Sequence, residues 1–251
     1  WGLALLALIV ALMLTLPILA RAETKPSDPK AVKVADEVMK ALGGEKAWSD
    51  LPGIRWTFGS SVNDTVRSSR RHAWNKHTGW HRIEGTTRAG VAFCWIENLN
   101  TGEGKAWMNG NAIEGDSLKT LLKRARSVWI NDSYWFLMPY KMRDPGVTLQ
   151  YSGDERANDT IWDKVQLTFD NVGDTPGDTY WVYVNRKNHR VERWDMVLQS
   201  DQPPPKTYSW EGWEEHDRLW FPTAHRQDKV NVFTNGVETV KEFRPTEFTA
   251  P

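Results

Sequence analysis

The sequence predicts a mainly β (α+β) fold, built on a wide, strongly curled and open antiparallel sheet with two inserted helices. Three observations predict it. Apolar residues recur with a period of two along most of the chain, as in strands with one buried face. About ten such strands are expected, and a sheet of that width must curl. The chain of 251 residues also carries 15 tryptophans, whose large rigid rings suit the inside of a curl.

The first 22 residues have the pattern of a secretory signal peptide. An apolar run from Leu3 to Leu14 is followed by Ala20-Arg21-Ala22, and such small residues suit a signal peptidase. Cleavage after Ala22 would leave residues 23–251 as one domain, periplasmic or otherwise exported. The alternative is a retained anchor, because residues 1–20 are about long enough to span a membrane. Pro17 and the small residues favour cleavage.

Composition excludes some classes of function. The 32 basic and 32 acidic residues cancel, and no basic run occurs, which argues against a nucleic-acid partner. Cys94 is the single cysteine, so no intramolecular disulfide can form. It lies in an apolar strand, and we expect a buried, inert thiol with a raised pKa.

The elements of the first half follow in order. Asp28-Pro29 predicts a helix start, with Asp28 as the cap and Pro29 in the first turn, and Gly43-Gly44 predicts its end. Strands are then expected at residues 54–58, 72–76, 80–84, 90–97 and 104–108.

A second helix is expected from Ser117 to Ile130, capped by Asp116-Ser117. An aromatic block from Tyr134 to Met138 follows it and is ended by Pro139. We expect helix and block to form a lid over the concave face. The cationic side would then face outward, where it could meet acidic lipid headgroups or a partner. The lid residues are Leu118, Leu121, Leu122 and Trp129, with Ala125 on the same stripe and Lys119, Lys123, Arg124 and Arg126 on the cationic side.

The second half returns to strands. They are expected at residues 147–151, 165–169, 180–184, 191–198, 208–214, 219–226, 230–233 and 237–243.

The aromatic residues are the main candidates for a ligand site. Part of them must form the core, but their number and even spread favour a hollow lined by rings, which suits acyl chains. A Trp-rich core alone is the alternative. The predicted lining is Trp56, Phe58, Trp74, Trp95, Trp107, Trp135, Trp181, Trp194, Met196 and Leu198, of which Trp56, Phe58, Trp95, Trp194, Met196 and Leu198 are expected on the concave side of one sheet.

Other chemistry has weaker support. His72, His77 and His81 lie close in sequence, but an odd spacing on a regular strand turns His72 and His77 to opposite faces, so no metal site is predicted. No catalytic motif and no cofactor-binding motif is found. The Glu211–Glu215 cluster around Trp213 leaves one alternative open, which is an exported protein that binds or cleaves glycans through exposed tryptophans.

Several segments resemble one family of periplasmic proteins. They include Tyr134-Trp135-Phe136-Leu137-Met138-Pro139 and Trp210-Glu211-Gly212-Trp213, with further matching stretches at residues 38–48, 144–147, 168–173 and 176–181. In these the chain resembles the LolA-like outer-membrane lipoprotein carrier and sorting proteins, in particular a Trp-rich branch. The likeness runs over nearly all of residues 23–251.

The resemblance implies a half-barrel of about eleven strands whose concave side is closed by helices. It implies a non-enzymatic, monomeric carrier that holds an acyl lipid or lipoprotein acyl chain and makes transient contact with a membrane or envelope partner. It also implies an arginine at the cavity, for which Arg55, Arg82 and Arg88 are the candidates.

Overall fold

The computed structural model describes residues 26–170 and 173–251. The expected signal peptide lies outside the described residues. None of the helices within the described ranges is long and apolar enough to cross a membrane.

Three helices are formed: α1 (Pro29–Ala41), α2 (Glu45–Asp50) and α3 (Gly115–Lys141). The cap of α1 is the predicted one, since the Asp28 carboxylate accepts a hydrogen bond from the Lys30 backbone N–H at 2.7 Å. One face of α1 is buried through Ala31, Val34 and Val38. Helix α1 lies against the strands β7 (Val147–Ala157) and β8 (Thr160–Phe169).

The larger sheet has eight strands in the order β14-β15-β1-β2-β3-β4-β5-β6. The order shows that the chain builds most of the sheet as a meander and then adds β15 and β14 at the far edge of β1. Their bounds are β1 Gly53–Val62, β2 Thr65–Asn75, β3 Trp80–Thr86, β4 Ala92–Asn98, β5 Gly104–Met108, β6 Asn111–Ile113, β14 Ala224–Gln227 and β15 Val230–Val240.

A second sheet has five strands in the order β11-β10-β9-β8-β7, and a small hairpin joins β12 to β13. The two larger sheets meet where β11 passes β14, because the Arg226 backbone N–H donates to the Ser209 hydroxyl at 3.0 Å. The bounds are β7 Val147–Ala157, β8 Thr160–Phe169, β9 Thr179–Asn185, β10 Val191–Val197, β11 Lys206–Ser209, β12 Glu214–His216 and β13 Leu219–Phe221.

The predicted fold class is confirmed: the strands pair antiparallel throughout the described residues, and the curl stays open. The expectation of one sheet is wrong in detail. Trp56, Phe58 and Trp95 belong to the larger sheet, whereas Trp194 and Met196 belong to the smaller one. The two sheets curve around a common interior, which is why alternation alone could not separate them.

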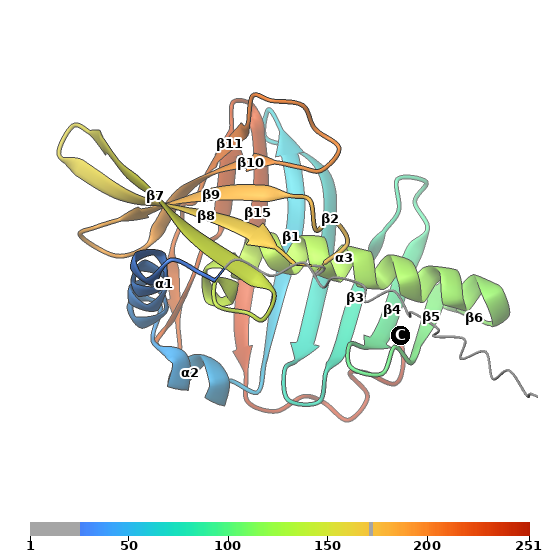
Figure 1. The fold of residues 1–251 in the computed structure, drawn as a ribbon. Coiled ribbons are helices and arrows are strands. Elements are labelled where there is room, and N and C mark those ends of the chain that lie inside the picture. Colours follow the sequence, from blue (N-terminus) through green and yellow to red (C-terminus); the bar gives the residue numbers. More distant parts are fainter. Residues whose placement is uncertain (1–25, 171–172) are drawn as a thin grey trace, which may run out of the picture.

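Helix α3 crosses the concave side of the larger sheet, as Figure 1 shows. Its first half packs through Ala125, with Leu118, Leu121 and Val128, on Ile83, Trp95 and Ala106. Its second half enters the main core with Phe136, Leu137 and Met138 fully buried. The prediction that this helix packs on the concave face is therefore confirmed.

The predicted boundaries of α3 are wrong at both ends. The helix begins at Gly115, and Glu114 at the cap position makes no capping hydrogen bond with its side chain. It continues without a break through the expected aromatic block to Lys141, with Pro139 inside its last turns. Proline is tolerated there because tertiary packing holds this segment, and only the Trp135 carbonyl loses its helical donor.

Candidate functional site

An open groove of about 1240 Å³ lies beside α3 at the β2–β3–β4 end of the larger sheet. It exists because β3 pairs with β2 only along Arg70–Trp74, so the earlier part of β2 has no β3 residue beside it. The lining comes from three places. Residues 66–71 belong to β2, residues 83–89 with Phe93 and Trp95 belong to β3, β4 and the loop between them, and Arg124 and Val128 belong to α3.

The apolar part of the groove consists of Ile83, Phe93, Trp95 and Val128. The rings of Phe93 and Trp95 are stacked, with centroids 4.4 Å apart. Val66 stands at the groove and is 58% exposed, the one large hydrophobic residue in the exposed class among the described residues. An exposed apolar side chain beside an apolar floor is typical of a binding groove.

Arginines surround this apolar part. Arg67, Arg70, Arg71, Arg88 and Arg124 all line the groove, with Glu84 as the one acidic residue in the lining. Arg70 is bound to Asp132, and Arg71 to Glu84. The Arg124 guanidinium lies 5.7 Å from the centroid of the Trp95 ring, where a cation–π contact also fixes its position.

The interior behind the second half of α3 is filled by rings. Trp56 stacks on Phe136 with centroids 5.2 Å apart. The Trp194 ring centroid lies 4.8 Å from that of Trp135 and 5.0 Å from that of Trp210. This aromatic packing is the alternative that the sequence left open, a Trp-rich core.

The predicted lining residues therefore fall into groups. Trp95 lines the groove. Trp56, Phe58, Trp194 and Met196 are buried in the main core, and Trp74, Trp135 and Leu198 pack against it half-buried.

Trp107 and Trp181 lie on the other faces of their strands. Ala106, next to Trp107, faces α3, and Trp107 pairs in register with Cys94. Trp181 alternates with the core residues Tyr180 and Val182. Successive strand residues point to opposite faces, so neither ring can reach the interior, contrary to expectation. Their strands were predicted correctly, but the face was not.

The expected lid residues all lie on α3. Leu118 and Leu121 are half-buried against the open half of the sheet. Leu122 approaches Gly104, where an added Cβ would meet its side chain at 2.6 Å. The Trp129 ring lies 4.7 Å from Trp74 and 4.8 Å from His81, centroid to centroid.

The sequence suggested that the whole cationic side of α3 faces outward, but only part of it does. Lys119 does, and it pairs with Asp116. Arg126 instead reaches the sheet, where it donates to the Leu99 carbonyl at 2.8 Å and lies 3.3 Å from the Glu97 carboxylate. Because Glu97 is buried, it needs this partner.

A buried polar network joins α3 to the sheet beneath it. Asp132 accepts two hydrogen bonds from Arg70, at 2.5 and 2.6 Å. Its carboxylate also lies 2.9 Å from Nε2 of His72, whose Nδ1 lies 3.0 Å from Nε2 of His81. A carboxylate can only accept, so His72 Nε2 carries a proton, and in two neutral rings His81 Nε2 donates to His72 Nδ1. Nδ1 of His81 has no hydrogen-bond partner among the described residues.

The charge states follow from burial. Burial lowers the pKa of His72 despite the Asp132 carboxylate. Burial also lowers the pKa of His81 well below its usual value, helped by the repulsion that a protonated His72 would exert and by the charge of Arg126. Burial would raise the pKa of Asp132, but hydrogen bonds from Arg70 and His72 outweigh it, so the pKa is lowered. The network therefore holds an ion pair and two neutral rings.

Sequence reasoning missed this network. β2 and β3 form a hairpin, and its register places His72 opposite Ile83 and Trp74 opposite His81. His72 and His81 thus share a face. Pairing the two strands across the turn would have found them. His77 is exposed and approaches the Ser49 carbonyl at 3.2 Å.

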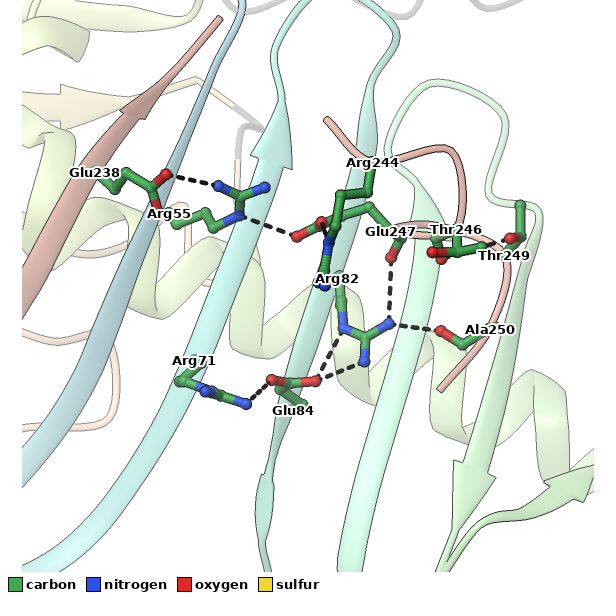
Figure 2. Close-up of polar contacts among 10 residues, drawn as sticks. All are labelled: Arg55, Arg71, Arg82, Glu84, Glu238, Arg244, Thr246, Glu247, Thr249 and Ala250. Atoms are coloured by element: carbon green, nitrogen blue, oxygen red, sulfur yellow. Dashed lines mark hydrogen bonds and ion pairs between the residues drawn. The ribbon is translucent and has the colours of Figure 1, made fainter. Parts of the chain in front are cut away.

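The candidate cavity arginines separate between the two faces. Arg88 lines the groove. Arg55 and Arg82 lie on the opposite face of the sheet and hold the C-terminal segment against it, as Figure 2 shows. Arg55 binds Glu247 at 3.0 Å, and Arg82 donates to the Ala250 carbonyl at 2.6 Å.

The Glu211–Glu215 region does not form an exposed aromatic strip. Trp210 is 2% exposed, and Trp213 packs against the main core. Glu211 is bound to Ser209 and lies 3.5 Å from Arg226. No tryptophan within the described ranges belongs to the exposed class, which removes the surface that a sugar-stacking site would need.

Cys94 is buried, as predicted, and burial raises the pKa of its thiol to about 11. Among the residues that the structure describes, no group of three or more His, Cys, Asp or Glu side chains could hold a metal ion.

No family model and no curated protein matches the sequence. In its fold the chain is similar to LolA superfamily proteins. One is a LolA superfamily protein from Nitrosomonas europaea, at 12% identity and a TM-score of 0.48 over 87% of this chain and 97% of the other.

Two further solved structures are similar to a like degree. One is a putative outer membrane lipoprotein-sorting protein domain from Vibrio parahaemolyticus, at 12% identity and a TM-score of 0.49, covering 88% of this chain and 96% of that one. The other is a DUF1329 family protein from Desulfovibrio piger, at 11% identity and a TM-score of 0.49, covering 88% of this chain and 98% of that one.

Proposed function

We propose that the protein is an exported, non-enzymatic binder of an acyl lipid or of the acyl chain of a lipoprotein. The observation that carries the proposal is the groove of about 1240 Å³ with its floor of Ile83, Phe93, Trp95 and Val128. Its volume exceeds the roughly 300–1000 Å³ of common small-molecule sites, and its apolar floor lies among polar and charged lining residues. A long flexible chain suits a larger open groove.

In this proposal the tryptophans of the main core support the site rather than line it. The rings behind α3 pack around Phe136, Leu137 and Met138 and so hold the second half of the helix in place. The first half borders the groove with Arg124 and Val128 and acts as the lid. A movement of this half would change the width of the groove without disturbing the main core.

The buried Asp132–His72–His81 chain is the nearest approach to a catalytic arrangement. Both rings and the carboxylate are at most 2% exposed. A general base must come within hydrogen-bond reach of the substrate proton it removes. Burial beneath α3 prevents this, so we assign the network to holding the helix and not to catalysis.

The proposal is tested with a fluorescent fatty acid titrated into the protein. Phe93→Ala removes a half-buried ring from the floor, and we expect the affinity to fall roughly tenfold, equivalent to about 1.4 kcal/mol. Trp107→Ala is the matched control, because it removes a half-buried ring from the neighbouring strand on the opposite face. Absence of saturable binding to the unmodified protein would refute the proposal.

A further inference from the structure

The charges around the groove are not explained by acyl-chain binding alone. Five arginines and one glutamate line it, although the whole chain has a formal net charge of zero. The local excess of positive charge is therefore a property of this site and not of the composition.

Two of these arginines are already committed. Arg70 holds Asp132 through two hydrogen bonds, and Arg71 pairs with Glu84. The other three are Arg67, Arg88 and Arg124. None of them has an ion pair with an acidic side chain among the described residues.

The three uncommitted guanidinium groups come from separate elements. Arg67 lies on β2, Arg88 in the loop between β3 and β4, and Arg124 on α3. All three residues are exposed and yet line one groove. Arginine binds carboxylate and phosphate oxygens through paired N–H donors.

Polar and apolar groups meet in the same groove. Arg124 lies over the ring of Trp95, which belongs to the floor. A ligand that lies on Phe93 and Trp95 thus brings its polar end within reach of the arginines. The complementary molecule is an amphiphile with an acyl chain and a negatively charged head.

We propose that the groove selects an acyl lipid with an anionic headgroup, a phosphate or a carboxylate, which Arg67, Arg88 and Arg124 bind while the chain lies on the floor. This inference rests on the proposed function and adds the class of ligand. Because the three residues are exposed, salt screens their attraction, so the selectivity falls as ionic strength rises.

The test compares two lysophospholipids with the same acyl chain, one with a phosphoglycerol head and one with a phosphocholine head, as competitors of a bound fluorescent fatty acid. We expect the apparent Kd of the anionic lipid to be roughly tenfold lower at low salt than that of the zwitterionic lipid. The triple variant R67Q/R88Q/R124Q should lose this preference and still bind the zwitterionic lipid.

Lys123→Gln is the matched control for Arg124→Gln. The two residues are adjacent on α3, both are exposed, and only Arg124 lines the groove. Lys123→Gln should leave the preference unchanged. Far-ultraviolet circular dichroism and urea midpoints verify that each variant is folded.

The outcomes separate the two proposals. Equal competition by both lipids with the unmodified protein overturns anion selectivity and leaves the proposed function standing. A preference that survives in the folded triple variant overturns the assignment to these arginines. Displacement of the probe by inorganic phosphate at the lipid's concentration would assign the arginines to a free anion and overturn the lipid headgroup. If no acyl compound binds at all, both proposals fail.

Discussion

The two ends of α3 lie on the same concave surface but in different surroundings. Around Phe136 the interior is closed, and rings from both sheets contact rings of α3. Around Ala125 the helix packs on a thin layer in which only Ile83, Trp95 and Ala106 are also fully buried. One end is fixed in the closed core, and the other borders the groove in which we propose that the ligand binds. Aromatic packing is therefore dense in the closed half, and the proposed site lies beyond it, with the stacked Phe93–Trp95 pair in its floor.

The largest effect should come from the closed half. Trp194→Ala removes a ring that is 1% exposed and touches Trp135, Tyr180 and Trp210. We expect the free energy of unfolding to fall by about 3–5 kcal/mol. Leu118→Ala, in the open half, should lower it by about 1 kcal/mol or less, since this side chain is only half-buried. Urea unfolding measures both, and similar losses would contradict the comparison.

The junction between the halves depends on a buried charge. Asp132→Asn leaves Arg70 without its anion and His72 with an altered partner, so we expect a loss of about 3 kcal/mol. Lys119→Gln removes an exposed charge from the same helix and should change stability by less than about 0.5 kcal/mol. A small loss in Asp132→Asn would show that the network does not hold α3.

The buried histidines predict a dependence on pH. His72, His81 and His225 have pKa values below the usual value near 6.5, that of His225 near 3. The unfolded chain therefore binds more protons than the folded chain once the pH falls below about 6.5. The free energy of unfolding should decrease as the pH falls from 6.5 toward 5, by up to about 1.4 kcal/mol per pH unit for each histidine.

His81→Gln tests this slope. Glutamine keeps an N–H donor toward His72 but does not titrate. Urea unfolding between pH 5 and 7.5 should show a shallower dependence in this variant, whereas His77→Gln, at an exposed position, should retain the original slope. Identical slopes in all three proteins would contradict the assigned protonation states.

The smallest effect concerns Cys94, on the strand that supplies Phe93 and Trp95 to the groove. Burial raises its thiol pKa to about 11, so little thiolate is present at neutral pH. We expect iodoacetamide to label the folded protein at least tenfold more slowly than the urea-unfolded protein, consistent with a pKa difference of about two units. Equal rates, followed by intact mass, would show that β4 opens readily.

The difference between the two ends of α3 is related to what the sequence could predict. Alternation within a strand identified the buried faces around Trp56 and Trp194, and helical periodicity identified the first half of α3. Both signals are local. The faces of Trp107 and Trp181 depend on which sheet side is covered, and the meeting of His72 with Asp132 joins residues 60 positions apart. Such contacts are set by register and tertiary packing, which a single strand does not record.

The end of α3 was missed for a related reason. Asn131-Asp132 and Pro139 are weak helix formers, and propensity alone predicts a break. Arg70 and His72 compensate the buried charge, and burial of Phe136 to Met138 holds the following turns. Tertiary contacts thus override the local preference. The groove could not be predicted, because it results from the incomplete pairing of β2 with β3.

The most direct test of the account locates the ligand itself. A fatty acid that carries a diazirine on its chain is bound, photolysed and mapped by mass spectrometry of proteolytic peptides. We predict adducts in the segments that line the groove, at residues 83–95 and 124–128, reduced by an excess of unlabelled fatty acid. Adducts concentrated instead on β9 and β10, at residues 179–197, would place the ligand in the aromatic half and contradict the account.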